Sequence, residues 1–279
     1  MRKSIKSQMT MLFNKKLTLM VFIGLILLIL YRFLCHVYEY EGVSTAVLIN
    51  PTRMLLLSAD EADAGTMSFY FLQLLPILVV LPVGFSYYDD KKSREKIYLV
   101  SKLGKKNYFL GKIISVFLVN FIIFAFPLLL ELALNCIAFP LEANGNYSNI
   151  GIYEQSYIAS AENYLYVESF AISSYLYATI TCLIFSVVAG ILGVFTVAVS
   201  MFFDKIKVIL LLPVYLLLYG IGMLNNVFLG INVKTSYFNY FTIYDETGKS
   251  RFTYFLVIFI VFILSIIYVF RIMKKDVLE

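Results

Sequence analysis

The sequence has no tryptophan, a single histidine and only three cysteines among its 279 residues. Cys35, Cys136 and Cys182 lie in or at the ends of apolar runs, without the paired spacing of a zinc site or a disulfide framework. Charged residues are also scarce, at 15% against about a quarter in soluble globular proteins. These shortages argue against a metal centre, a disulfide scaffold and a soluble globular fold.

Catalytic and nucleotide-binding motifs are missing too. The sequence contains no GxxxxGK[ST], HExxH or GxSxG motif, and no GxGxxG motif that follows a strand. We therefore expect no catalytic, cofactor-binding or metal-ligating residues in this chain, and no ATP hydrolysis by the chain alone. The net charge of +5 comes from basic residues beside apolar runs, so we expect no nucleic-acid partner.

Long apolar runs are what the sequence does have. It is 61% hydrophobic with a mean hydropathy of +0.83, which is typical of an integral membrane protein. Helices of about 20 apolar residues cross a bilayer. We predict one all-α domain over residues 1–279 with six transmembrane helices, at 17–34, 67–87, 108–139, 171–203, 208–224 and 252–270.

The basic residues favour one orientation. Eighteen of the 23 Lys and Arg residues lie in residues 1–16, 89–112, 204–207 and 271–275, which the six helices place on one side. Excess Lys and Arg mark cytoplasmic segments, so both termini are predicted to be inside. Arg32, near the end of the first helix, is expected to snorkel outward. The abundance of Ile, Lys, Tyr and Phe with no Trp suggests an AT-rich bacterial genome. With the predicted spans, we therefore expect a multi-pass protein of a bacterial cytoplasmic membrane.

Two segments outside the long helices are predicted to lie at the membrane surface or to re-enter it. Residues 1–16 place Met1, Ile5, Met9 and Leu12 on one helical face, which predicts an amphipathic helix on the inner leaflet. The apolar stretch from Val227 to Val233 is too short to cross a bilayer, so we interpret it as a possible re-entrant outer piece before the last helix.

The charged segment 89–112 lies between two membrane-length apolar runs. Ser93 is positioned to cap a short helix with Ile97, Val100 and Leu103 at every third position, and Gly104 is positioned to end it. Two interpretations stay open: the helix rests on anionic lipid headgroups, or it docks a soluble partner.

Glu131 is the only carboxylate deep inside an apolar run. It shares a helical face with Asn120 and Asn135, because eleven and four residues separate them at about 100° per residue. An intramembrane ionisable residue is a functional candidate by default, so these residues are candidates for lining a substrate pathway. The alternative is a neutral Glu131 that hydrogen-bonds between helices.

Small residues recur at four-residue spacing in the fourth apolar run. Such pairs allow helices to approach closely, although small residues that face lipid are equally compatible with the pattern. The candidate packing residues are Ser186, Ala189, Gly190 and Gly193.

The segment LVSKLGKKNYFLGK, residues 99–112, together with the six-helix topology and the amphipathic amino terminus, resembles the permease subunits of ABC-2-type exporters. Tyr108 and the Gly111-Lys112 pair match the family's entry into the third helix, whereas Lys102 stands where a proline is usual. The resemblance implies a dimeric permease, homo- or heterodimeric, whose first inner loop couples it to a separate ATPase that binds ATP and Mg²⁺. The implied coupling residues are Ser93, Glu95, Ile97, Val100, Leu103, Gly104, Lys105 and Lys106.

The resemblance makes an exporter permease the leading interpretation, with ABC ATPase subunits, a second permease and membrane lipids as partners. The substrate is expected to be amphipathic or lipid-like, such as a peptide, a drug or a lipid. Two other classes stay open: a non-transporting immunity or scaffold protein, and an intramembrane enzyme, for which the spans show no second catalytic group beside Glu131.

Overall fold

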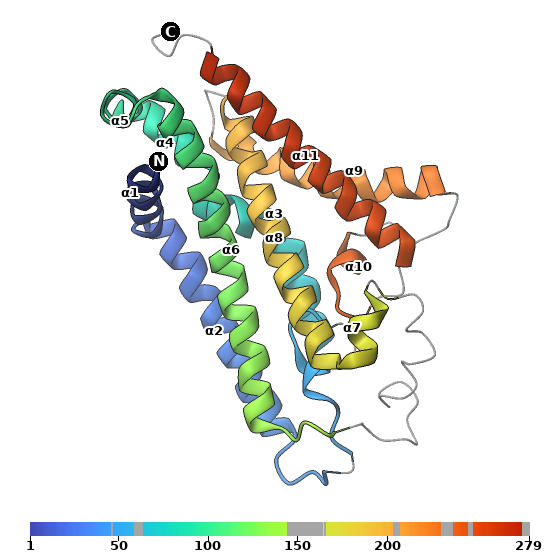
Figure 1. The fold of residues 1–279 in the computed structure, drawn as a ribbon. Helices are drawn as coiled ribbons and strands as arrows, with labels where there is room; N and C mark the ends of the chain where they lie inside the picture. Colours follow the sequence, from blue (N-terminus) through green and yellow to red (C-terminus); the bar gives the residue numbers. More distant parts are fainter. Residues whose placement is uncertain are drawn as a thin grey trace.

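A computed structural model describes residues 1–45, 47–58, 64–143, 164, 166–202, 207–229, 237–244 and 248–274. Over these ranges the regular elements are all helices (Figure 1). Among the described residues, five helical segments are long and apolar enough to cross a membrane: Lys16–Glu39, Met67–Lys92, Lys105–Ala138, Ser174–Ser200 and Arg251–Lys274. The predicted all-α membrane fold class is confirmed.

The long helices form a bundle with two distinct ends. Helices α1 (Arg2–Phe13), α4 (Ser86–Lys92) and α5 (Glu95–Leu103) gather at one end, together with the carboxyl end of α11 (Gly248–Lys274) (Figure 1). We call this the α5 end. The connections that follow α2 (Lys16–Glu39) and α6 (Lys105–Ala138) lie at the opposite end. Three of the segments predicted to share one side of the membrane, 1–16, 89–112 and 271–274, are therefore at one end of the molecule, while residues 203–206 lie outside the described residues.

Helix α6 is longer than a bilayer core is thick. Its 34 residues would measure about 50 Å as a straight helix, more than a bilayer core of about 30 Å. Pro127 lies inside this helix. Helix α8 (Ser174–Ser200) packs along it and forms the centre of the bundle (Figure 1).

The second apolar run is broken in two where the sequence predicted one continuous helix. Helix α3 (Ala64–Val83) ends before Gly84, and α4 begins at Ser86. A Cβ atom on Gly84 would lie 2.7 Å from the Thr196 Cγ2 atom and from the Val80 carbonyl oxygen. The glycine thus allows the chain to turn in close contact with α8.

The predicted fifth span differs from the other five. It consists of a 3-10 turn, η4 (Lys207–Leu211), and α9 (Leu212–Leu229), whose apolar stretch Val208–Ile221 is shorter than the five long segments. Helix α9 is strongly inclined to α6 and α8 (Figure 1). Val227 to Leu229 continue α9, and residues 230–233 lie outside the described residues, so the re-entrant piece stays a prediction.

Segment 48–58, which contains no α-helix, is inserted among the helices, although the sequence predicted no buried element between the spans 17–34 and 67–87. Its apolar residues are buried, including Met54, Leu56 and Leu57, each 0–1% exposed. The short turn η1 (Pro51–Met54) forms because the Asn50 side chain accepts a hydrogen bond from the Thr52 backbone N–H. Leu57 also accepts a hydrogen bond from the Ile243 N–H, beyond α10 (Phe238–Phe241). Helix α7 (Val167–Ile172) precedes α8 toward the end of the bundle opposite α5 (Figure 1).

Candidate functional site

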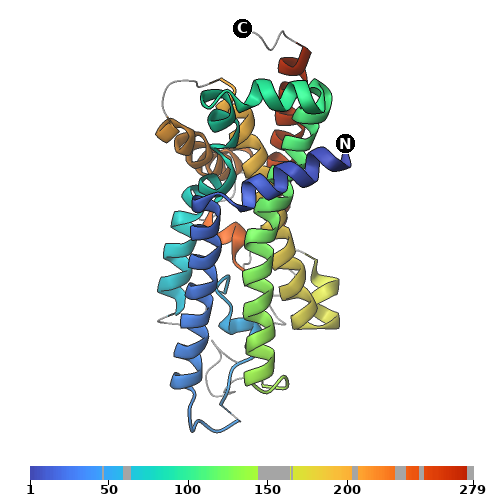
Figure 2. The same cartoon turned by 90° about the vertical axis from the view of Figure 1, so that its left-hand side faces the viewer.

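The candidate site is the surface that α1, α4 and α5 form at the α5 end. Figure 2 shows α1 crossing the long helices at this end, close to the start of α6. Helix α5 joins α6 with only Gly104 between them. Gly104 has φ 80° and ψ 145°, a conformation that residues with a Cβ rarely adopt. The junction therefore depends on glycine at this position.

Helix α5 is amphipathic, but its faces differ from those predicted. Leu99 is 6% exposed, and Val100 and Leu103 pack partly against the core. Ile97 and Tyr98 are 56% and 61% exposed. Ile97 was predicted to share the apolar face with Val100 and Leu103; it lies instead at the outer edge, beside Tyr98.

The predicted cap at Ser93 is wrong. Ser93 ends α4, and its hydroxyl donates to the Asp89 carbonyl oxygen at 2.9 Å. Arg94 precedes α5 with φ 59° and provides no side-chain cap. The prediction placed only one short helix in this segment and did not include α4. Because α4 ends at Ser93, a carbonyl oxygen of its last turn binds the hydroxyl that was expected to cap α5.

The remaining coupling candidates lie along this surface. Glu95 and Lys106 are exposed, while Lys105 is half-buried at the first turn of α6. A groove of about 550 Å³ separates α5 from α1, and its lining includes Glu95, Tyr98 and Lys102 from α5 and Lys3 and Met11 from α1. The structure thus places the predicted coupling residues on one surface that also includes α1.

Helix α1 is held against α6 by polar contacts that the apolar periodicity did not indicate. The Gln8 amide donates to the Tyr108 carbonyl oxygen at 3.0 Å, and the Ser4 hydroxyl donates to the Asn107 carbonyl oxygen at 2.8 Å. A Cβ on Gly111 would lie 2.5 Å from the Ser4 hydroxyl oxygen. The buried face of α1 is therefore Ser4, Gln8 and Leu12, whereas Met1 is 55% exposed.

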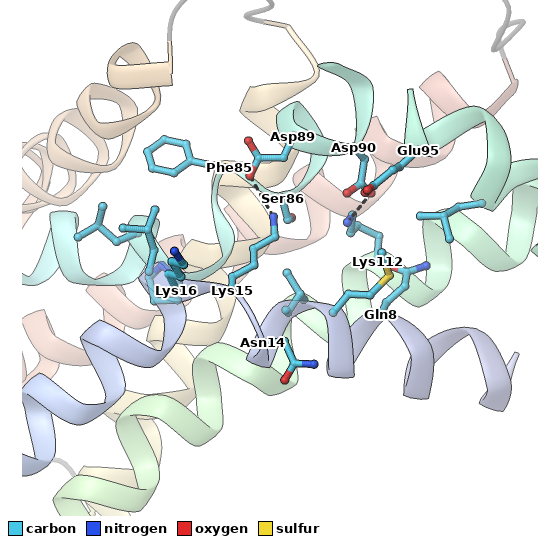
Figure 3. A pocket seen from close by; sticks show the side chains of 16 residues that line it. Gln8, Asn14, Lys15, Lys16, Phe85, Ser86, Asp89, Asp90, Glu95 and Lys112 are labelled. Carbon is cyan, nitrogen blue, oxygen red and sulfur yellow. Dashed lines mark hydrogen bonds and ion pairs between the residues drawn. The ribbon is translucent and has the colours of Figure 1, made fainter. Parts of the chain in front are cut away.

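Two ion pairs connect the helices beneath this surface (Figure 3). The Lys112 ammonium lies 2.7 Å from the Asp90 carboxylate, and both side chains are about 5% exposed. The Tyr108 hydroxyl donates to the same carboxylate at 2.7 Å. The more exposed Lys15 ammonium lies 3.0 Å from the Asp89 carboxylate. The pairs fix α4 against α6 and against the start of α2.

Glu131 is buried in the bundle interior, 1% exposed. Its two carboxylate oxygens accept from the Leu56 backbone N–H at 2.9 and 3.0 Å, and Arg32 Nε lies 3.5 Å away. The prediction that Arg32 snorkels outward is wrong, since Arg32 is 2% exposed. Arg32 is drawn inward because Glu131 and the carbonyl groups of segment 48–58 offer partners that lipid does not.

The other two pathway candidates are also buried in the bundle. The Asn120 amide donates to the Val79 carbonyl oxygen at 3.0 Å and to the Ala189 carbonyl oxygen at 3.1 Å, so it links α6 to α3 and α8. Asn135 is 0% exposed, and within the described part of the chain its amide has no hydrogen-bond partner. A pathway role for the three residues stays a prediction.

The small-residue face of α8 lies against α6 and α3. Ser186 and Ala189 are at most 1% exposed. A Cβ on Gly190 would lie 2.8 Å from the Phe117 ring, and one on Gly193 would lie 2.5 Å from the Asn120 amide nitrogen and 3.0 Å from Val83. The four residues thus face helices of the same chain.

Sequence reasoning missed further buried cations. Arg53 is 1% exposed, with its guanidinium 4.0 Å from the centre of the Tyr244 ring. Arg251 is 2% exposed and donates to the carbonyl oxygens of Tyr240 and Thr242 at 3.0 and 2.7 Å. The only sequence signal was their position next to apolar residues, which does not indicate burial.

Among the described residues, no group of three or more His, Cys, Asp or Glu side chains is placed to hold a metal ion. Comparisons of the chain with protein-family models, curated proteins and solved structures found no match.

Proposed function

We propose that this chain is the membrane-spanning permease subunit of an ATP-driven exporter, with six spans, both termini in the cytoplasm and a separate ATPase as its motor. α9 would be the remaining span, a short and inclined one. A second permease, identical or different, would complete the translocation path for an amphipathic substrate. The observation that carries the proposal is that α5, which Gly104 joins directly to the start of α6, exposes Ile97 and Tyr98.

The connection between α5 and α6 supports a mechanical role. Gly104 alone separates the two helices, and α6 then runs through the whole bundle against α8. The buried Lys112–Asp90 pair and the polar contacts of α1 brace the first turns of α6. A force applied to α5 would therefore reach the centre of the bundle.

The exposed surface of α5 supports a partner. Ile97 and Tyr98 are large apolar side chains more than half exposed, next to a groove of about 550 Å³. Lys102 and Lys106 supply charge nearby. An ATPase can drive the permease only if its contacts here differ in free energy between its nucleotide states.

Purification of the native complex from its own membrane, with mass spectrometry of every subunit, tests the proposal. An ATP-binding subunit should copurify in stoichiometric amount. Charge reversal at Lys105 and Lys106, two residues next to this surface, should preserve insertion but uncouple ATP hydrolysis from export. Isolation of the chain with no ATPase under conditions that preserve complexes would contradict it and favour a scaffold or immunity protein.

A further inference from the structure

A cavity of about 520 Å³ with charged side chains in its lining lies between α1 and α4, bounded also by the start of α2, the end of α3, α5 and Lys112 of α6 (Figure 3). Its lining carries equal numbers of acidic and basic side chains: Asp89, Asp90 and Glu95 against Lys15, Lys16 and Lys112. Two pairs of them are bound to each other, Lys15 with Asp89 and Lys112 with Asp90. Lys16 and Glu95 form no ion pair with the described residues.

Two buried polar atoms in this lining have no hydrogen-bond partner among the described residues. The Gln8 and Ser86 side chains are each 1% exposed, and the Gln8 Oε1 and Ser86 Oγ atoms are unpartnered. Gln8 donates through Nε2 to the Tyr108 carbonyl oxygen, which fixes Oε1 as a hydrogen-bond acceptor. Buried polar groups are nearly always hydrogen-bonded, to protein or to ordered water, so a ligand group that bonds to these two atoms would stabilise this site.

The cavity borders an apolar groove along two of the membrane-length helices. The groove, about 630 Å³, lies between α2 and α3, and Leu17 and Leu81 line both spaces. Gly24 lies in its wall, and a Cβ there would meet no atom within 4 Å. A cavity with charged side chains at the helix ends, next to an apolar groove, matches the headgroup and the acyl chain of a lipid.

We propose that the cavity and the groove together hold one membrane phospholipid whose headgroup carries a primary amine. An acyl chain lies in the α2–α3 groove, and the phosphate lies near Lys15 and Lys16 at the start of α2. The ammonium group lies toward Gln8 and Glu95. Leu17, which lines both spaces, directly follows Lys15 and Lys16 in the chain, and Figure 3 shows Gln8 and Glu95 on the other side of the cavity from Lys16.

The chemistry of the lining selects this headgroup. Because the acidic and basic side chains balance, a headgroup without net charge fits better than an anionic one such as phosphatidylglycerol. The Gln8 Oε1 acceptor requires a hydrogen-bond donor, which the trimethylammonium of phosphatidylcholine lacks. The binding site does not depend on the proposed transport role, because it rests on the cavity alone.

Native mass spectrometry of the full chain in mild detergent tests the proposal. The protein is mixed with equal amounts of phosphatidylethanolamine, phosphatidylcholine and phosphatidylglycerol that carry the same acyl chains. We expect one phosphatidylethanolamine to be retained per chain in preference to the other two lipids. Gly24→Leu should abolish the retention by filling the groove. Gly220→Leu is the control, since Gly220 in α9 also has open space around its Cβ position.

Glu95→Gln tests the headgroup end without touching the core, because Glu95 is exposed. Phosphatidylethanolamine should then lose its advantage over phosphatidylcholine. Equal retention of the three lipids by the unmodified chain would overturn the proposal. Unchanged retention in a folded Gly24→Leu variant would overturn it as well.

Discussion

The Arg32 guanidinium and the Glu131 carboxylate lie 3.5 Å apart inside the bundle, each from a different membrane-length helix. Between them they also bind segment 48–58: Glu131 accepts from the Leu56 N–H, and Arg32 donates to the Met54 carbonyl oxygen at 3.1 Å. A buried backbone outside the α-helices needs such hydrogen-bond partners. The pair therefore holds α2, α6 and the inserted segment together.

Glu131→Gln should destabilise the protein, because it leaves the Arg32 charge buried without a counter-charge. Loss of one partner of a buried ion pair costs about 3–5 kcal/mol. The Arg32→Met/Glu131→Leu double variant should recover part of this loss, since it removes both charges. Thermal unfolding in detergent measures the effect. A Glu131→Gln variant with unchanged stability and impaired export would instead support the pathway prediction.

The role of this pair could not be predicted from the sequence. Periodicity and hydropathy located α2, α6, α8 and α11, because long apolar runs have few alternatives to a membrane helix. They do not show which face of a helix meets which neighbour, so Arg32 was predicted to snorkel toward the outer surface rather than to pair with Glu131. Likewise, Ser4 and Gln8 lie on a polar face of α1, and only their contacts with α6 reveal that this face is buried.

Gly193→Leu should prevent correct packing of α8. A Cβ at this position would already lie 2.5 Å from the Asn120 amide nitrogen and 3.0 Å from Val83. Overpacking costs about 1–3 kcal/mol, and more where backbones must separate. Size-exclusion chromatography and thermal unfolding should show aggregation or lower stability. Gly220→Leu, at an open position, is the matched control; equal behaviour of the two variants would refute close packing at Gly193.

Gly104→Ala should loosen the connection between α5 and α6. The backbone at φ 80° and ψ 145° is strained for alanine by about 1–3 kcal/mol. Hydrogen exchange measured by mass spectrometry should be faster in α5 and unchanged in α8. Gly220→Ala lies in a helix with open space and should be neutral or slightly stabilising. Unchanged exchange in α5 would show that the junction tolerates a Cβ.

The proposed orientation predicts opposite labelling of the two ends. In a background without native cysteines, Tyr38→Cys should react with a membrane-impermeant maleimide added to intact cells, and Lys92→Cys should not. Tyr38 is 80% exposed at the end opposite α5, and Lys92 is exposed beside α5. Both should react after lysis. Labelling of Lys92→Cys in intact cells would reverse the orientation.

The most direct test of the coupling surface is photocrosslinking from α5 in native membranes. A benzophenone amino acid replaces Tyr98, which is 61% exposed on α5, or Tyr38, which is 80% exposed at the other end. We expect position 98 to crosslink to an ATP-binding subunit, with a yield that changes when nucleotide is added, and position 38 to give no such product. Crosslinks from position 98 to lipid alone, or to a protein that binds no ATP, would contradict the account.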